Sequence, residues 1–269
     1  MFGAIYGDVI GSYYETHGTK DYDFPFHPDS SYTDDTVLTV ATCQAILHNP
    51  HKISKWNTEK RGLEYAAQYR RYYSLHPSAG FGTMFSHWAR SEEFSINHSY
   101  GNGAAMRAVP IGYAYNSEKQ VLLQAKASCY YTHNNREAIK AARAVALAVY
   151  LARTGISKEG IKLTLQKKFG YNLECSIDDI RKNYEFDSRA SYSVPPAIIA
   201  FLESTDYESA IRNAISIGGD ADTQACIAGG IAEAFYGEIP ENISEFCYNR
   251  IDNMMKNVIK EFRAKFCGA

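Results

Sequence analysis

Residues 2–15 carry the sequence pattern that most restricts how this chain can fold. Apolar side chains recur three or four positions apart, at Phe2, Ile5, Val9 and Tyr13. Glycines recur every four positions, at Gly3, Gly7 and Gly11. On a helix, the apolar set forms one stripe toward a core, and the glycine set leaves a strip where a second helix can approach closely. The pattern therefore predicts a helix over residues 2–15 that packs tightly against another helix.

The same helical period dominates the rest of the chain. It predicts further helices over 35–48, 58–74, 117–131, 135–153, 193–203, 206–217, 222–236 and 244–266. Alternating apolar and polar residues, which are typical of strands, are nearly absent. The turn-rich stretches are too short and too little biased to be interdomain linkers, at 16–32, 76–82, 97–103 and 170–192. We therefore expect an all-α fold with residues 1–269 in a single domain.

Composition and charge exclude several classes of protein. Of the 269 residues, 45% are hydrophobic and 22% are charged, which is ordinary for a globular chain with a sizeable core. The formal net charge of −2 gives no general attraction to nucleic acid or to an anionic membrane. No stretch approaches the roughly 20 apolar residues of a membrane span. The N-terminus lacks a basic leader and reaches Asp8 too early for a signal peptide.

The cysteines indicate a reducing environment. They lie at positions 43, 129, 175, 226, 247 and 267, and no two form a Cys-x-x-Cys pair. This spacing suits neither a zinc site nor a dense disulfide framework. We interpret them as reduced core thiols of a cytoplasmic protein.

Two short acidic clusters lie far apart in the sequence and have a similar composition. They are "TDDT" (33–36) and "GGDADT" (218–223), and each stands just before or at the start of a predicted helix. Thr33 or Asp34, and likewise Asp220 or Asp222, could simply cap those helices and complement their dipoles. The presence of two such clusters favours a second interpretation, in which carboxylates and hydroxyls from both converge on one point.

Convergence of the two clusters would require a cation. Four carboxylates in a low-dielectric pocket repel one another strongly unless their charge is neutralised. The ligating atoms of both clusters are all hard oxygens, with no histidine or cysteine among them, which favours Mg²⁺ or Mn²⁺ over zinc. Two cations that share a carboxylate suit this number of anionic groups better than one. We therefore predict a site for two Mg²⁺ or Mn²⁺ ions.

Three longer motifs contain these clusters or lie between them. "YTDDT" (32–36), "SYGNGAAMRAVP" (99–110) and "GGDADTQACIAGGIAEAFYG" (218–237) resemble, in this order, the motifs of the ADP-ribosylglycohydrolase family. The likeness extends over roughly residues 1–240. It implies a compact orthogonal bundle of helices with a binuclear Mg²⁺ or Mn²⁺ centre.

The resemblance also implies a role for each residue of the metal site. One cation would be held by Thr33, Asp34, Asp35 and Asp222. The other would be held by Asp220, Asp222 and Thr223. Glu15, which closes "GDVIGSYYE" (7–15), matches a family glutamate that reaches the metal site and moves aside for substrate. Asp34, Asp35 or Asp220 would take a proton from the attacking water.

The substrate-binding residues follow from two glycine-containing stretches. "SAGFGT" (78–83) and "HSYGNGAAMR" (98–107) resemble the family loops around the diphosphate and the distal ribose. The residues implied are Gly80, Gly82, Ser99, Tyr100, Gly101, Asn102, Gly103 and His133. Glycine lets backbone N–H groups approach phosphate, Asn102 can add an amide, and Tyr100 would stack on adenine. A Gly-x-Gly is also typical of an ordinary turn, and His133 is also typical of a helix-terminal histidine.

Two other charged residues have structural interpretations. Arg107 lies inside a helical pattern, so it either contacts phosphate or pairs with a carboxylate. Asp8 lies within the first helix, and we expect it to orient that helix.

The function implied by the resemblance is hydrolysis of an α-linked ADP-ribose bond. The substrate would be an ADP-ribosylated protein or a small conjugate, the product would be ADP-ribose, and the enzyme would be a monomer. "ETHG" (15–18) is closest to the serine-type branch and favours serine or acetyl ester over arginine as the acceptor. We expect selectivity to lie near Glu15 and in the aromatic loop 16–32, where Asp21 and Asp23 would instead suit a guanidinium.

Two other functions use the same residues differently. A two-metal phosphohydrolase would cleave the pyrophosphate and release AMP. A non-catalytic protein would bind ADP-ribose without turning it over.

Overall fold

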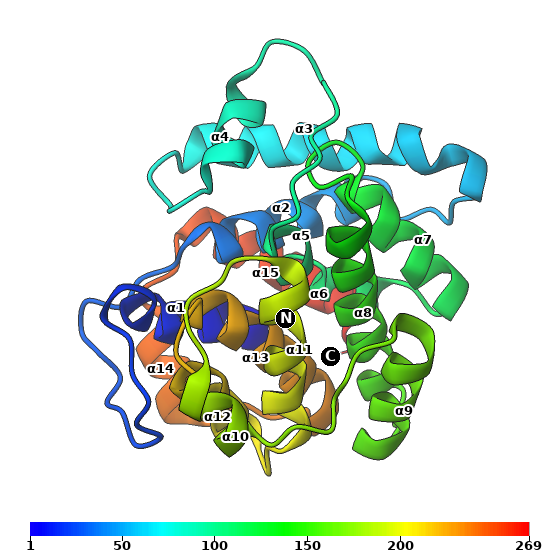
Figure 1. The fold of residues 1–269 in the computed structure, drawn as a ribbon. Coiled ribbons are helices and arrows are strands. Elements are labelled where there is room, and N and C mark those ends of the chain that lie inside the picture. The colour runs from blue at the N-terminus through cyan, green and yellow to red at the C-terminus, as the bar shows by residue number, and fades with distance from the viewer. Residues whose placement is uncertain (269) are drawn as a thin grey trace.

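Helix α13 (Ala221–Tyr236) lies in the interior of the molecule, and its residues from Ala221 to Glu233 are all buried. Helices α1, α8, α11 and α12 pack around it (Figure 1). The computed structural model describes residues 1–268. The expected single domain over 1–269 stays a prediction, and its last residue, Ala269, lies outside the described residues.

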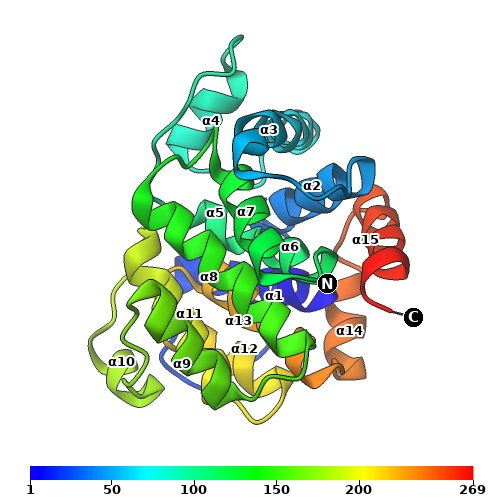
Figure 2. The same ribbon diagram turned by 90° about the vertical axis from the view of Figure 1, so that its right-hand side faces the viewer.

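The helices cross at large angles, as in an orthogonal bundle (Figures 1 and 2). In chain order they are α1 (Phe2–His17), α2 (Asp34–His48), a 3₁₀ turn (Lys55–Asn57), α3 (Thr58–Leu75), α4 (Thr83–Arg90), α5 (Gly103–Met106), α6 (Val109–Ala114), α7 (Glu118–Cys129), α8 (Arg136–Arg153), α9 (Lys158–Phe169), α10 (Ile177–Asn183), α11 (Ala190–Leu202), α12 (Tyr207–Ser216), α13, α14 (Glu241–Tyr248) and α15 (Asn253–Phe266). The all-α prediction is therefore confirmed.

The glycines of α1 bring its backbone against that of α13. A Cβ placed on Gly7 would lie 2.1 Å from the carbonyl oxygen of Ala225, and one on Gly11 would lie 2.6 Å from that of Ala221. No side chain fits at such distances, so only glycine permits this approach. The predicted close helix partner of residues 2–15 is thus α13.

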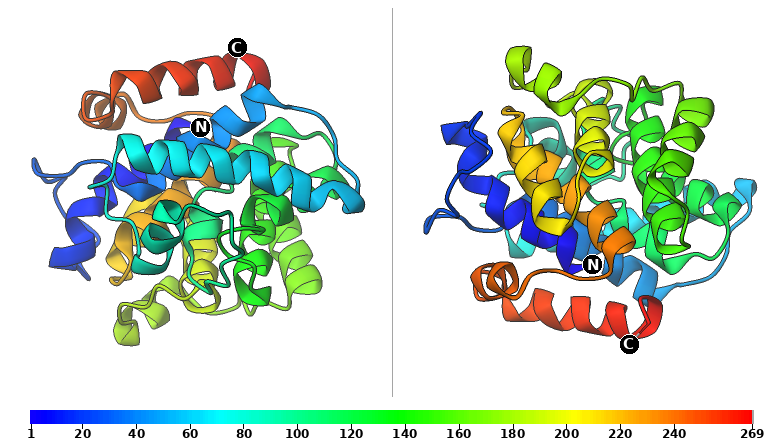
Figure 3. Two further views of the ribbon diagram at one scale, coloured as in Figure 1. Left: turned by 90° about the horizontal axis from the view of Figure 1, so that it is seen from above. Right: turned by 90° about the horizontal axis from the view of Figure 1, so that it is seen from below.

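The C-terminal segment corrects one prediction. Residues 244–266 were expected to form one helix, but the structure has α14 and α15, which run in different directions (Figure 3). Asp252 accounts for the break, because its carboxylate accepts hydrogen bonds from the backbone N–H groups of Met254 (2.7 Å) and Met255 (3.3 Å). An N-cap of this kind starts a new helix within a continuous apolar pattern.

Several short helices were not predicted from the sequence. Helices α4, α5, α6 and α10 are too short to show a clear period, and α10 lies inside the stretch 170–192 that was expected to be irregular. Helix α9 is longer and had recognisable ends. The Ser157 hydroxyl accepts from the N–H of Gly160 at its start, and Gly170 adopts a left-handed conformation (φ 64°) at its end.

Residues 1–268 contain no β-sheet, but two isolated bridges hold the loop 97–103 in place. His98 pairs with His133, and Gly101 pairs with Arg189. The loop is therefore fixed to the start of α8 on one side and to the start of α11 on the other. Separately, no helix in the described part of the chain combines the length and apolar character that a membrane crossing needs.

The close packing of α1 on α13 predicts that Gly7→Ala destabilises the protein. The added Cβ would force the two helices apart, and overpacking of this kind costs at least about 2 kcal/mol of unfolding free energy. Urea denaturation followed by circular dichroism measures the loss.

Gly160→Ala on α9 is the matched control. Its Cβ would meet the Ile156 Cγ2 at 2.8 Å and the Ser157 Oγ at 3.4 Å, both side-chain atoms, and the Ile156 side chain can move. We expect a change within about 1 kcal/mol, since alanine also favours a helix. Equal stability of the Gly7 and Gly160 variants would contradict the backbone contact.

Candidate active site

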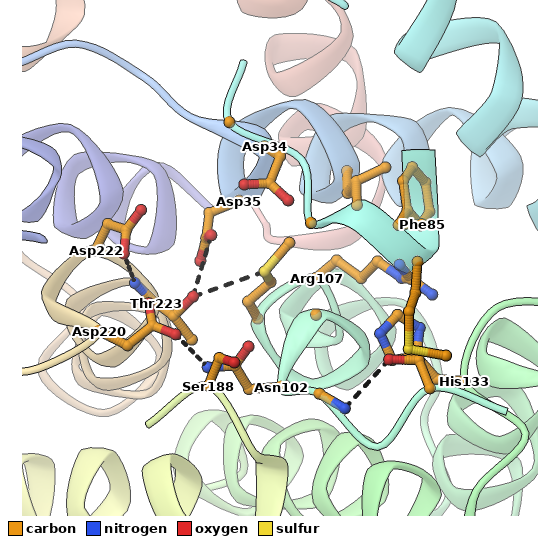
Figure 4. Close-up of a pocket in the computed structure, with 18 of the residues that line it drawn as sticks. Asp34, Asp35, Phe85, Asn102, Arg107, His133, Ser188, Asp220, Asp222 and Thr223 are labelled. Carbon is orange, nitrogen blue, oxygen red and sulfur yellow. Dashed lines mark hydrogen bonds between the residues drawn. The ribbon is translucent and has the colours of Figure 1, made fainter. Parts of the chain in front are cut away.

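Five acidic side chains line a cavity of about 370 Å³, and they are Glu15, Asp34, Asp35, Asp220 and Asp222. The end of α1 and the starts of α2 and α13 form its acidic wall, and the segments 80–84 and 99–103, which lead into α4 and α5, form other parts (Figure 4). All the residues expected at the site line this cavity except Thr33. The structure thus gathers residues from both ends of the chain into one pocket.

The two acidic clusters meet through direct hydrogen bonds. The Thr223 hydroxyl lies 3.2 Å from Asp35 Oδ2, and the Thr33 hydroxyl lies 3.2 Å from Asp222 Oδ2. Carboxylate oxygens of Glu15, Asp220 and Asp222 all lie within 4.8 Å of one another. The expectation that the clusters converge is confirmed, and Glu15 joins them from the last turn of α1.

Asp34 and Asp35 lie beside this trio and are not part of it. A Cβ on Gly80 would be 3.8 Å from Asp34 Oδ1, so Asp34 faces the loop at 80–82. Asp35 is buried, and its Oδ1 has no hydrogen-bond donor. A buried carboxylate oxygen without a donor is costly, and a bound cation would satisfy it.

The cluster is electrostatically unfavourable by itself. Burial, followed by repulsion from neighbouring carboxylates, raises the pKa of Asp34, Asp35 and Asp222 well above the usual aspartate value. Partial desolvation of its carboxyl, followed by repulsion from Asp220 and Asp8, raises the pKa of Glu15 to about 7. Divalent cations would offset both effects, and the all-oxygen donor set fits Mg²⁺ or Mn²⁺.

Asp8 holds the start of α2 in position. Its buried carboxylate accepts hydrogen bonds from the backbone N–H groups of Thr33 (3.0 Å) and Thr36 (3.0 Å) and from both of their hydroxyls. The sequence predicted that Asp8 orients the first helix. The structure shows instead that it joins α1 to α2, directly behind Asp34 and Asp35.

The turn before α13 directs the second cluster. Gly218 (φ 75°) and Gly219 (φ 102°) both adopt left-handed conformations, which confirms the expected tight turn into Asp220. The ammonium group of Lys20 donates to the carbonyl of Tyr184 (2.8 Å) and to that of Ile217. This contact fastens the loop 18–32 to the same turn.

Asn102 connects the glycine-containing loop to the acidic wall. Its side-chain amide donates to Asp220 Oδ2 (2.7 Å) and to the Ser193 hydroxyl (3.1 Å), while its backbone N–H donates to the Ser188 carbonyl (2.8 Å). The sequence assigned this amide to phosphate. In the structure it orients a carboxylate, and the exposed ring of Tyr100 remains free on the same loop.

The wall opposite the acids contains Arg107, His133 and Phe85 (Figure 4). His133 is buried, and burial followed by the Arg107 charge lowers the pKa of its imidazole well below the usual value. A Cβ on Gly103 would lie 3.1 Å from His133 Nε2, so Gly103 leaves room for the ring. We expect a neutral imidazole at this wall.

Among residues 1–268, no carboxylate pairs with Arg107, which corrects one of its two interpretations. Its guanidinium donates to the Thr132 hydroxyl (2.6 Å) and the Ser128 carbonyl (3.3 Å), and it lies 4.1 Å from the centre of the Tyr69 ring. The buried Nε and Nη1 atoms have no hydrogen-bond partner among the described residues.

Several residues that line the pocket were not predicted from the sequence. Conversely, no residue of the loop 16–32, where selectivity was expected to lie, lines the pocket. The missed residues are Leu38, Thr83, Met84, Phe85, Met106, Phe186 and Ser188. Phe24 is instead buried against Tyr14, and Phe26 packs against Phe246. Neither Asp21 nor Asp23 lines the cavity. The apolar pattern of this loop therefore reflects core packing.

Comparison with known proteins matches almost the whole chain. A family model described as ADP-ribosylglycohydrolase matches residues 1–266. Human ADP-ribosylhydrolase ARH3 is 28% identical over 98% of this chain and 92% of its own length, and the Xenopus tropicalis protein of that name is 28% identical over 90% and 88%. An uncharacterized protein of Archaeoglobus fulgidus is 30% identical over 78% and 73%. The solved structure of an "ADP-ribosylglycohydrolase-related protein complex" has the same fold, with a TM-score of 0.73 and 24% identity over 98% and 95%.

The hydrogen bonds of Asp8 predict that Asp8→Asn destabilises the start of α2. The amide offers one acceptor atom where the carboxylate offered two, so buried donors of Thr33 or Thr36 lose their partner. We expect a loss of about 2–3 kcal/mol of unfolding free energy. Asp29→Asn, at an exposed position in the preceding loop, should change it by less than about 0.5 kcal/mol. Urea denaturation that found both variants equally stable would rule out this anchoring role.

Proposed function

The chain belongs to the ADP-ribosylglycohydrolase family, and we propose that it uses divalent cations to release ADP-ribose from a serine or acetyl ester oxygen. Its family, together with relatives named ADP-ribosylhydrolase, makes it a glycohydrolase that cleaves ADP-ribose linkages. A monomeric state and a cytoplasmic location stay predictions.

The observation that carries the proposal is the meeting of Glu15 with both acidic clusters in one cavity. A set of carboxylates this close is unfavourable unless positive charge neutralises it. The oxygen donors and the unpartnered Oδ1 of Asp35 support a hard divalent cation. We propose two such ions, held by Thr33, Asp34, Asp35, Asp220, Asp222 and Thr223.

When bound, these cations would supply Lewis acidity toward the ribose hydroxyls and lower the pKa of a water molecule. The protein supplies the remaining functions. Asp34, Asp35 and Asp220 are the candidate bases for the attacking water, since all three line the cavity. The same negative wall would stabilise the positive charge that develops on the ribose ring in an oxocarbenium-like transition state.

Glu15 has a position suited to a gate. It is exposed at the end of α1, whereas Asp220 and Asp222 behind it are buried. A side chain on the solvent side of the cluster can leave without disturbing the helix packing beneath it. We propose that Glu15 moves away from the other carboxylates when substrate enters.

The rest of the cavity suits the ADP half of the substrate. The residues of the glycine-containing loops, Gly80, Gly82, Ser99, Gly101 and Gly103, leave space for phosphate oxygens to approach the backbone. Tyr100 is 55% exposed, which leaves its ring available to a base. The neutral His133 and the free N–H groups of Arg107 can donate to ribose or phosphate oxygens on the opposite wall.

The choice of an oxygen-linked acceptor has two supports. Asp21 and Asp23, the acids expected to receive a guanidinium, lie outside the lining of the cavity. The motif "ETHG" (15–18) most resembles the serine-type branch of the family. Both features favour serine or acetyl ester over arginine.

Asp222→Ala tests whether the Asp222 carboxylate is a ligand that both cations share. We expect kcat/KM to fall at least about 100-fold and Mn²⁺ binding, followed by electron paramagnetic resonance, to weaken in parallel. Asp178→Ala on α10, at an exposed position, should leave both unchanged. Chelation of the wild-type protein should abolish activity, and Mg²⁺ or Mn²⁺ should restore it. An active Asp222 variant, or restoration by zinc alone, would contradict the proposed centre.

Product analysis tests the reaction and the acceptor. ADP-ribose linked to serine, to arginine and to acetate is incubated with the metal-loaded enzyme, and products are separated by chromatography. We expect intact ADP-ribose from the serine and acetyl ester substrates, at least about tenfold faster than from arginine. Faster release from arginine would overturn the acceptor, AMP would indicate a phosphohydrolase, and no turnover would indicate a binding protein.

A further inference from the structure

A second cavity, of about 570 Å³, lies between α7, α8 and the end of α9. Figure 2 shows these three helices side by side on one face of the molecule. The cavity shares no lining residue with the acidic pocket. Its cationic lining residues are Lys126, Arg136, Lys140, Arg143 and Lys168. One acidic residue, Glu137, accompanies them, in a protein whose overall charge is −2.

The cations of this basic cavity lack enough counter-ions. Lys140 lies 3.7 Å from Glu137, and Lys168 lies 2.7 Å from Glu118. Over residues 1–268, no ion pair forms with Lys126, Arg136 or Arg143. Positive charges crowded in this way repel one another, and an anion placed between them would relieve the repulsion.

Arg143 is the residue whose unsatisfied donors most favour a bound anion. Its guanidinium has no hydrogen bond to any described residue, and its Nε atom is buried. A buried N–H group without an acceptor is unfavourable, and more so when it carries charge. The planar guanidinium matches two oxygens of a phosphate group, which would satisfy these donors.

The helix periodicity places the cationic residues of α8 on the face that lines this cavity. Arg136, Lys140 and Arg143 lie four and three residues apart on α8, so they share one face. Arg136 is the first residue of α8, where the helix dipole also favours an anion. Leu122, Ile139 and Phe169 complete the lining with apolar surface that suits a flat ring beside the phosphates.

We propose that this basic cavity binds an oligophosphate group, carried by a nucleoside triphosphate or present as a free inorganic chain. Several closely spaced negative charges match the three unpaired cations better than a single phosphate does. The apolar surface near Phe169 favours the nucleoside triphosphate of the two. This site is independent of the acidic pocket and of the reaction proposed for it.

Isothermal titration calorimetry with inorganic tripolyphosphate and with ATP tests the proposal. The protein is kept free of divalent metal, so that no cation in the acidic pocket attracts either probe there. We expect one site for each probe, weaker at high salt, with ATP the tighter ligand. Arg143→Gln and Lys126→Gln should each weaken binding about tenfold, because each removes a charge-assisted contact. Lys260→Gln on α15 removes the same charge elsewhere and should leave the affinity unchanged.

The outcomes separate the alternatives. Equal affinity for tripolyphosphate and ATP would support the free chain as the source of the phosphates. Binding of neither probe at low salt, or binding that both cavity variants leave unchanged, would overturn the site. The exposed Lys126 variant keeps this test valid if Arg143→Gln lowers stability. Asp222→Ala should bind both probes as the wild type does, whatever its catalytic activity.

Discussion

The contact between the backbones of α1 and α13 is the constraint on which the site depends. Two helices approach this closely only where one of them lacks side chains, and Gly3, Gly7 and Gly11 provide that strip. The contact sets the N-terminal segment of the chain against a buried helix from its last third. As a result, the end of α1 delivers Glu15 to the start of α13, where Asp220 and Asp222 stand.

A rigid scaffold is needed because the carboxylates of the site repel one another. Mutual repulsion would separate the carboxylates if the loops that bear them were free to move. Neutral groups hold the clusters together without neutralising the charge, since the Thr223 hydroxyl donates to Asp35, and the Thr33 hydroxyl, which donates to Asp8, lies 3.2 Å from Asp222. Asp8 then fixes the start of α2 from inside the core. The carboxylates thereby stay close enough together to hold cations.

The parts of this arrangement that the sequence predicted are those written in local patterns. The glycine repeat specified the close helix pair, and the two acidic motifs identified the residues that converge. Contacts between segments that are distant in the chain have no such pattern in the sequence. Ser188 and Phe186 come from an irregular stretch with no motif, and they enter the pocket because Gly101 pairs with Arg189. The aromatic loop 16–32 was expected to contribute to selectivity, because composition alone does not distinguish a core aromatic such as Phe24 or Phe26 from a binding one.

Asn102 stands at the boundary between the two halves of the cavity. Its backbone belongs to the loop expected to surround the diphosphate, yet its side chain supports Asp220 in the acidic wall. Any displacement of that loop is therefore transmitted to the carboxylate by a single amide. A ligand seated at the remote end of the cavity would steady the acid at the reacting end. The nucleotide portion of the substrate would then align the acid for a reaction at the other end of the same substrate.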